Sequence, residues 1–204
     1  MNVVIVIPAR HASSRFPGKP LAQLRGAGGG ARSLVRRSWD AARAVPGGHR
    51  VIVATDDDRV AGHAAGFGAE VAMTSASCRN GTERCAEVLE ALSPRPDLVV
   101  NLQGDAPLTP PDFVSALIDA MAADPAAPAA TPVLRCDAAA LARFREDRRE
   151  GRVGATTAVF GGTGRALYFS KEVIPFSDGV DPATPSPVFH HLGLYAYRPE
   201  ALAA

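Results

Sequence analysis

Three positively charged side chains, Arg10, Arg15 and Lys19, fall within ten residues near the N-terminus of the chain. Small or turn-forming residues separate them, and a run of apolar residues, 3–7, precedes them. A loop of this kind can turn backbone N–H groups and cations toward one polyanion. We therefore interpret it as a phosphate-binding loop in preference to a solvated basic loop.

A carboxylate occupies a comparable place later in the chain. Asp105 ends the triplet Gln103-Gly104-Asp105, which directly follows the apolar run 98–102. Gly104 allows the backbone to approach a ligand closely. Mg²⁺ takes one or two carboxylates and completes its shell with water and phosphate oxygens, so one aspartate near several cations suits a magnesium–nucleotide site.

The elements that must position these loops alternate between strand and helix. Apolar runs without polar alternation are typical of strands buried on both faces, and Gly, Pro and Asp residues separate them from helical stretches. The predicted strands are 3–7, 50–55, 70–73 and 98–102, and the predicted helices are 33–44, 58–65, 83–92 and 111–123. This alternation predicts a doubly wound α/β sheet, whose ligands bind beyond the carboxyl ends of the strands.

Two helix starts have specific capping predictions. We interpret the acidic triplet 56–58 as an N-cap with first-turn acids in preference to a metal site, and Thr82 as the N-cap of the helix 83–92. The later part of the chain is richer in strands. A strand ends the segment 126–134, a hairpin joins 153–160 to 166–169, and a last strand covers 192–197.

Composition excludes several classes of protein. The chain has 204 residues, of which 47% are hydrophobic and 21% charged, and its formal net charge is +1. This balance is that of a globular protein and argues against a general nucleic-acid or membrane surface. The chain shows no signal peptide and no apolar stretch of membrane-spanning length. Three unpaired cysteines, Cys78, Cys85 and Cys136, suit a reducing cytoplasm, which is the predicted location.

Five motifs then carry a family resemblance over essentially the whole chain. In order they read PARHASSRFPGKPL, NGTER, QGDAPL, ALYFSK and HHLGLYAYR. They closely resemble the 3-deoxy-manno-octulosonate cytidylyltransferases, or CMP-Kdo synthetases. The resemblance implies a Rossmann-like nucleotide-diphospho-sugar transferase fold, with a mostly parallel mixed sheet, helices on both faces and a β-rich substrate lobe. It also implies Mg²⁺-dependent joining of CTP and Kdo into CMP-Kdo and pyrophosphate for lipopolysaccharide biosynthesis.

The resemblance also assigns roles to residues. Arg10, Lys19 and Asp105 would be catalytic, and Asp105 would ligate the metal. The residues implied in nucleotide binding are Pro8, Ala9, Arg10, Arg15, Lys19, Gly81, Arg84 and Gln103. Those implied at the sugar acid are Gln103, Tyr168, Ser170 and His191.

Several positions depart from the family pattern. Ala106 replaces a glutamate, and Thr157, Lys171, His190, Cys78 and Asn80 stand where the family has other residues. We expect residues 1–204 to form a single cytidylyltransferase domain without the family's C-terminal segment, which carries a second metal-binding aspartate. Two alternatives stay open: a cytidylyltransferase for another 2-keto sugar acid (8-amino-Kdo or a nonulosonic acid), and a truncated nucleotide-binding homologue without turnover. A homodimer is also left open.

Overall fold

The computed structural model describes residues 1–12, 16–177 and 184–202. These residues form two compact units. Unit 1 comprises Met1–Ala130 together with Gly193–Ala204, and unit 2 comprises Thr131–Leu192.

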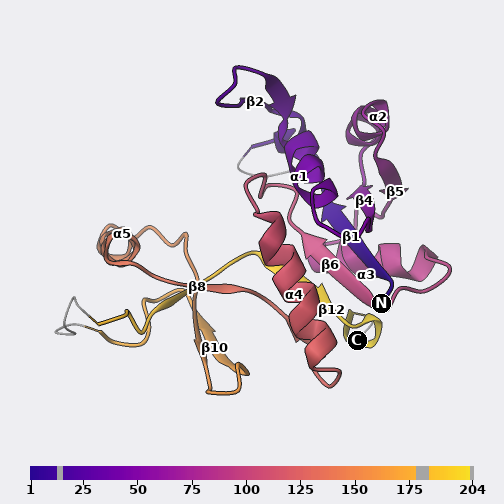
Figure 1. The fold of residues 1–204 in the computed structure, drawn as a ribbon. Coiled ribbons are helices and arrows are strands. Elements are labelled where there is room, and N and C mark those ends of the chain that lie inside the picture. Colours follow the sequence, from indigo (N-terminus) through magenta and orange to yellow (C-terminus); the bar gives the residue numbers. More distant parts are fainter. Residues whose placement is uncertain (13–15, 178–183, 203–204) are drawn as a thin grey trace. The chain divides into compact units, whose positions relative to one another are not determined.

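Unit 1 is built on a six-stranded mixed sheet (Figure 1). Its strands are β1 (Val3–Pro8), β4 (Arg50–Thr55), β5 (Glu70–Met73), β6 (Leu98–Leu102), β7 (Ala129–Ala130) and β12 (Leu194–Tyr197). They lie in the order β5-β4-β1-β6-β12-β7, with the first four parallel and β12 antiparallel to both neighbours. The mostly parallel α/β architecture predicted from the alternating pattern is confirmed.

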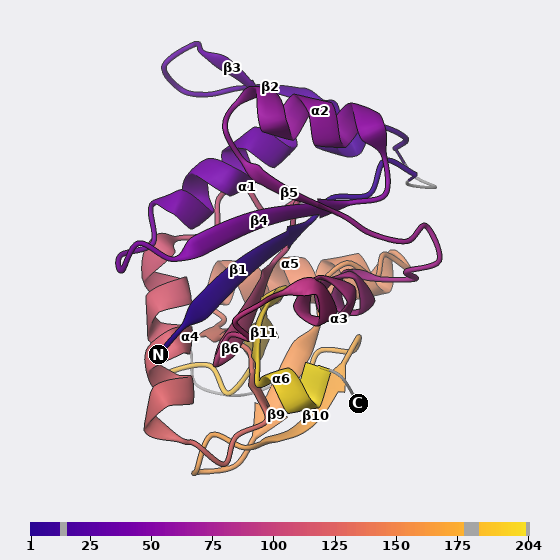
Figure 2. The same cartoon turned by 90° about the vertical axis from the view of Figure 1, so that its right-hand side faces the viewer.

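Both faces of this sheet are buried, which explains why its strands lack polar alternation. Val3, Ile5 and Ile7 of β1 pack into one apolar core, whereas Val4 and Val6 pack into another on the opposite face. Each such side chain contributes about 1.5–3 kcal/mol when fully removed from water. The first core is covered by α1 (Leu34–Arg43), α2 (Asp58–Gly66) and α4 (Pro111–Ala123), and the second by α3 (Gly81–Ala91) and α6 (Pro199–Leu202) (Figure 2).

The helix starts follow local capping chemistry, with one correction. The Asp57 carboxylate accepts hydrogen bonds from the first turn of α2, which confirms the capping interpretation of the acidic triplet. The predicted cap Thr82 is wrong, because α3 begins earlier and the Asn80 side chain accepts from the Glu83 N–H at 2.9 Å. An Asn side chain competes well for this position, since its carbonyl oxygen reaches the same orphan N–H groups.

The segment between β1 and α1 contains structure that the sequence did not predict. A short 3-10 helix, η1 (Lys19–Leu21), begins at Lys19. The strands β2 (Gln23–Arg25) and β3 (Ala31–Ser33) then form a small antiparallel hairpin, which encloses the glycine-rich segment 26–30.

Unit 2 contains a four-stranded antiparallel sheet and one charged helix. Its elements are β8 (Val133–Arg135), α5 (Ala138–Arg149), β9 (Thr157–Phe160), β10 (Ala166–Ser170) and β11 (Phe189–His191), and the strand order is β10-β9-β11-β8. The predicted hairpin forms as β9 and β10, but its first strand begins at Thr157. The predicted strand 192–197 is also shorter: it begins at Leu194, because the chain leaves the unit 2 sheet after His191 and pairs with β6 of unit 1 from Leu194 onward.

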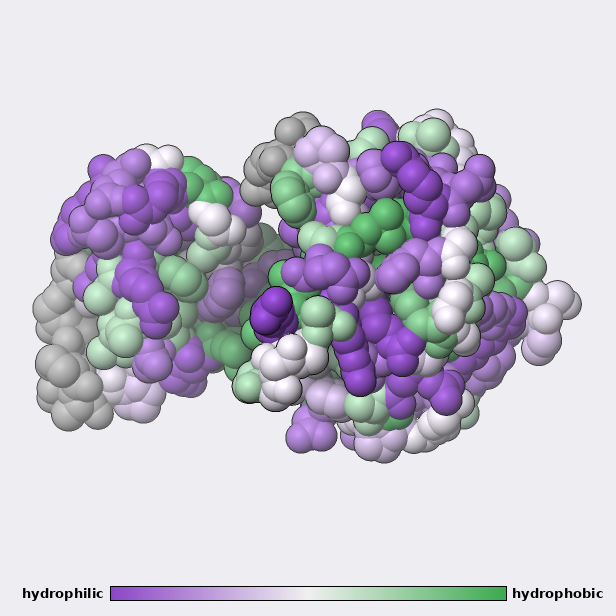
Figure 3. Space-filling model, turned by 90° about the horizontal axis from the view of Figure 1, so that it is seen from above, coloured by the Kyte–Doolittle hydropathy of each residue, from purple (hydrophilic) through white to green (hydrophobic). Residues whose placement is uncertain are grey.

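Several large apolar side chains are exposed, among them Leu108, Leu167 and Phe176. On the face seen in Figure 3, hydrophobic side chains form small patches among hydrophilic ones. Cys78, Cys85 and Cys136 are all free thiols, as predicted. Within the described ranges, no helix combines the length and apolar character needed to cross a bilayer.

Candidate active site

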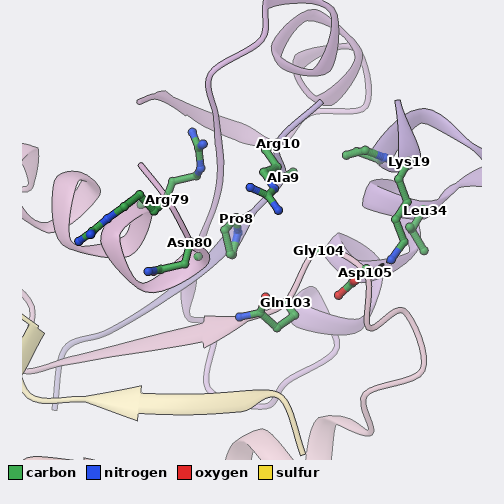
Figure 4. Close-up of a pocket in the computed structure, with 13 residues that line it drawn as sticks. Pro8, Ala9, Arg10, Lys19, Leu34, Arg79, Asn80, Gln103, Gly104 and Asp105 are labelled. Atoms are coloured by element: carbon green, nitrogen blue, oxygen red, sulfur yellow. Dashed lines mark hydrogen bonds and ion pairs between the residues drawn. The ribbon is translucent and has the colours of Figure 1, made fainter. Parts of the chain in front are cut away.

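A polar pocket lies beyond the carboxyl ends of the central strands of unit 1. Because β1 and β6 are parallel neighbours, the loops that follow them meet at one edge of the sheet. The N-terminus of α3 and the helix η1 supply the remaining walls (Figure 4). The pocket has a volume of about 270 Å³ and is lined by Pro8, Ala9, Arg10, Lys19, Pro20, Leu34, Arg79, Asn80, Gly81, Arg84, Gln103, Gly104 and Asp105.

This pocket brings together most residues of the predicted nucleotide site. Those that line it are Pro8, Ala9, Arg10, Lys19, Gly81, Arg84, Gln103 and Asp105. Arg15 lies outside the described residues. Three motifs that are far apart in the chain therefore share one cavity, as the rule for parallel strand ends predicts.

Gly104 allows the loops after β1 and β6 to touch. A Cβ atom at this position would lie 2.5 Å from the Pro8 carbonyl oxygen. Real Cβ atoms do not approach a backbone oxygen so closely, so only glycine fits without movement of one strand end. The glycine of the QGD motif thus allows two backbone segments of the chain to lie close together within the site.

The positive charges of the pocket differ in their partners. The Lys19 Nζ donates to Asp105 Oδ2 at 2.7 Å, and both side chains are more than a third exposed. Arg10 is exposed and, in the part of the chain that the structure describes, forms no hydrogen bond or ion pair. Figure 4 shows these three side chains around the same pocket. Arg10 follows β1, Lys19 begins η1 and Asp105 follows β6. The pocket therefore offers one uncommitted guanidinium and one solvent-accessible ion pair to an anion.

Replacing Lys19 by Ala is expected to weaken CTP binding at least about tenfold while leaving folding almost unchanged. A charge-assisted hydrogen bond to phosphate contributes about 1.5–3 kcal/mol, whereas an exposed ion pair contributes about 0–1 kcal/mol to stability. Calorimetric titration with CTP and a thermal melt measure the two effects. Lys171→Ala, which removes the chain's other lysine, is the matched control. Equal CTP affinity in both variants would remove Lys19 from the phosphate site.

Arg84 has a different environment from Arg10. Its side chain is only 2% exposed, and its guanidinium donates to the Thr74 hydroxyl and pairs with Asp56 Oδ2 at 3.4 Å. These partners follow β5 and β4, so Arg84 connects two strand ends to the start of α3. Arg84 contributes to the pocket wall, but its charge is already committed to protein partners. Its connection to Thr74 and Asp56 was not predicted from the sequence.

Arg79 and Asn80 were also missed as pocket residues. Asn80 caps α3, and Arg79 is held from outside by Glu83, whose carboxylate lies 2.8 Å from its guanidinium. The backbone N–H and guanidinium of Arg79 lower the pKa of Glu83 and keep it ionised. Arg79 directly precedes the NGTER motif and Asn80 is its first residue, and this place at a helix N-terminus facing the pocket is the signal that could have located both.

The predicted sugar-site residues Tyr168, Ser170 and His191 belong to the sheet of unit 2. The Tyr168 side chain is exposed, and the Ser170 hydroxyl accepts from the Glu172 N–H at 2.9 Å. The His191 ring packs edge-on against Phe169, with 5.0 Å between ring centroids. Gln103, the fourth predicted sugar residue, lies in the unit 1 pocket, where its amide donates to Asn101 at 2.8 Å.

Two departures from the family pattern have internal partners in unit 2. Thr157 is fully buried and its hydroxyl donates to the Glu172 carbonyl at 2.7 Å. The Lys171 Nζ donates to the Thr156 hydroxyl at 2.8 Å. Thr157 thus contributes to packing of the unit 2 sheet. Lys171 keeps a positive charge near His191, where it lowers the pKa of that ring after the larger effects of burial and of His190.

Acidification is expected to destabilise the protein through its adjacent histidines. Burial lowers the pKa of His190 and His191 below the ordinary value of 6.5, so the unfolded chain binds more protons than the folded chain as pH falls through that value. Stability is therefore lost on the acid side. Thermal melts at about pH 7.5 and about pH 5.5 should differ less for His190→Gln/His191→Gln than for the parent. An unchanged difference in the double variant, as expected for the control His49→Gln, would contradict this.

The residues present fit a magnesium ion that is shared with a nucleotide. Among the described residues, no three His, Cys, Asp or Glu side chains converge as a protein-only metal site. Asp105 offers one accessible carboxylate at the pocket, where a cationic group, the Lys19 ammonium, already approaches it closely. A single carboxylate suffices for Mg²⁺ when phosphate oxygens and water supply the other ligands.

Parallel strand ends that carry cations, a carboxylate and a helix N-terminus around one pocket define a nucleotide-binding α/β enzyme. The model of the family described as "Cytidylyltransferase" matches residues 4–203. The 3-deoxy-manno-octulosonate cytidylyltransferase of Maricaulis maris is 44% identical over 99% of this chain and 75% of its own length. The enzyme of the same name from Chlamydia pneumoniae is 41% identical over 97% of this chain and 71% of its own.

A solved structure agrees with these relatives. A CMP:2-keto-3-deoxy-manno-octonic acid synthetase complexed with CTP superposes with a TM-score of 0.83 at 35% identity, covering 99% of this chain and 76% of that one. The chain belongs to the cytidylyltransferase family, among the 3-deoxy-manno-octulosonate cytidylyltransferases.

Proposed function

We propose that this protein transfers CMP from CTP to Kdo, giving CMP-Kdo and pyrophosphate, as a step toward lipopolysaccharide. The observation that carries the proposal is the unit 1 pocket, in which the loops bearing Arg10, Lys19 and Asp105 meet. The relatives named for this reaction share about two fifths of the sequence over nearly the whole chain.

In this proposal, the protein acts mainly by positioning and by neutralising charge. The anomeric hydroxyl of the sugar acid attacks the α-phosphorus of CTP in line with the departing pyrophosphate, and the hydroxyl proton passes to solvent. Arg10 and Lys19 hold the phosphates and stabilise the charge that develops on the leaving group, because cations aimed at developing charge in a preorganised site lower the barrier strongly. Asp105 would hold Mg²⁺, which supplies further neutralisation of phosphate charge when bound.

The remaining predicted residues have supporting roles in the same proposal. The backbone of Pro8, Ala9 and Gly81 and the side chains of Gln103 and Arg84 would surround the nucleoside, and Arg15 would join the phosphate contacts. The sugar-acid contacts predicted for Gln103 and for Tyr168, Ser170 and His191 remain part of the proposal. We also propose that the protein is cytoplasmic, which its free thiols support. We propose that the two units belong to a single domain. Light scattering at several protein concentrations would test for a homodimer.

Pyrophosphate release tests the function directly. The assay combines Mg²⁺ and CTP with Kdo, 8-amino-Kdo or a nonulosonic acid in separate reactions, and UTP replaces CTP as the nucleotide control. We expect release to be fastest with CTP and Kdo. Faster release with another sugar acid would favour the alternative substrate. CTP binding without any release would favour a nucleotide-binding homologue without turnover.

A further inference from the structure

Ser38 of α1 contacts the turn that contains Gly104 and Asp105 but does not itself line the pocket. Its side chain is fully buried, and its hydroxyl lies 3.0 Å from the Gly104 carbonyl oxygen and 3.3 Å from the Leu34 carbonyl oxygen. The Leu34 carbonyl lies four residues earlier in the same helix, where it can accept the Ser38 backbone N–H. In the described part of the chain, the Ser38 hydroxyl is the hydrogen-bond donor found for the Gly104 carbonyl.

The Gly104 carbonyl belongs to the central peptide group of a β-turn. The Ala106 N–H donates to the Gln103 carbonyl at 3.0 Å, which closes a β-turn with Gly104 and Asp105 at its centre. The two common turn types differ by a flip of this central peptide group. The flipped form requires a positive φ at the second central residue, and no described residue other than glycine has one.

The flip would therefore strain Asp105 and redirect its carboxylate. The hydrogen bond from Ser38 opposes this flip, because it holds the carbonyl of the peptide group that would have to rotate. The close approach of Gly104 to Pro8 and the hydrogen bond from Ser38 both restrain the turn.

We propose that Ser38 is a positioning residue that fixes the direction of the Asp105 carboxylate by anchoring the Gly104–Asp105 peptide. Ser38 does not line the pocket, so it acts through the turn alone. The inference rests on the proposed function, in which Asp105 holds Mg²⁺ for CTP binding. Groups behind a metal ligand usually change metal affinity or activity about 10- to 100-fold when they are removed.

The test compares Ser38→Ala with Ser115→Ala by calorimetric titration of CTP, with and without Mg²⁺. Ser115 of α4 also donates to a helix carbonyl four residues earlier, at 3.4 Å from Pro111 O, but it lies away from the pocket and provides the matched control. We expect Ser38→Ala to reduce the Mg²⁺-dependent gain in CTP affinity about tenfold and to leave metal-free CTP affinity unchanged. Ser115→Ala should behave like the parent in both titrations.

The outcomes separate this inference from the proposed function. If the parent protein does not bind CTP, the proposed function fails first. If the parent shows a Mg²⁺-dependent gain and Ser38→Ala retains it, the positioning role is overturned. A loss that is equal with and without Mg²⁺ would also overturn it, because a general packing defect gives that result. Should Ser38→Ala fail to fold, Ser38→Cys keeps the branching of the side chain with a slightly larger and weaker donor and should lose part of the gain.

Discussion

Asp105→Asn is expected to lower turnover at least about 100-fold and to remove the dependence of CTP binding on Mg²⁺. Asn has the size of Asp but lacks the negative charge that a hard cation requires. The change also removes the ion pair between Lys19 and Asp105, whose side chains are 39% and 52% exposed, respectively. Because the pair is exposed, its loss should cost less than about 1 kcal/mol of stability. Pyrophosphate release across a Mg²⁺ series and CTP titrations measure both effects.

Asp112→Asn is the matched control for this substitution. Asp112 is exposed in the first turn of α4, the next element after the QGD turn, and does not line the pocket. Its replacement should cost a few tenths of a kcal/mol through the helix dipole and leave the Mg²⁺ response intact. An active Asp105→Asn protein with an ordinary Mg²⁺ response would show that the metal binds elsewhere.

Gly104→Ala should abolish high-affinity CTP binding and destabilise unit 1 by about 1–3 kcal/mol. The new methyl group would lie 2.5 Å from the Pro8 carbonyl oxygen, a backbone atom that cannot swing aside like a flexible side chain. One strand end must therefore move, and either the loop that carries Arg10 or the turn that carries Asp105 moves with it. Because misplacement of a reacting group by about 1 Å can cost about 100-fold in rate, turnover should fall even in molecules that remain folded.

Gly62→Ala makes the same chemical change at a position where we expect stability to rise instead of fall. Gly62 lies inside α2, and a Cβ there would meet no atom within 4 Å. Alanine is favoured over glycine in a helix by up to about 1 kcal/mol, so this variant should melt at a higher temperature and bind CTP normally. If Gly104→Ala melted and bound CTP like Gly62→Ala, the close approach of the two loops would not matter for the site.

Much of the site could be located from the chain alone, for a definite reason. Arg10, Lys19 and Asp105 all follow apolar runs or lie in the loops after them, and parallel strands present their carboxyl ends at one edge. That rule predicts proximity without any knowledge of contacts. It could not find Ser38, because a serine within an amphipathic helix has no pattern that indicates its partner 66 residues away.

Two of the wrong element boundaries show what residue pattern leaves undecided. Asn80 and Thr82 are both acceptable N-caps by residue type, and only the backbone geometry of the loop selects Asn80. The last predicted strand was too long because apolar residues continue through Leu192, while the sheets on the two sides of Gly193 are different. Residue pattern reports burial, and it does not report which strand is the partner.

The order of residues determines the helices and strands, their alternation and the sheet edge that carries the phosphate loop, because periodicity and capping depend on near neighbours in the chain. It does not determine whether each charged side chain is buried or paired. Arg84 is buried against Thr74 and Asp56, while Arg10 is exposed and has no partner among the described residues, although both are arginines in recognisable motifs. Burial and partner distance determine whether a cation can meet a ligand, and both arise when β4, β5 and β6 bring distant segments within hydrogen-bonding range.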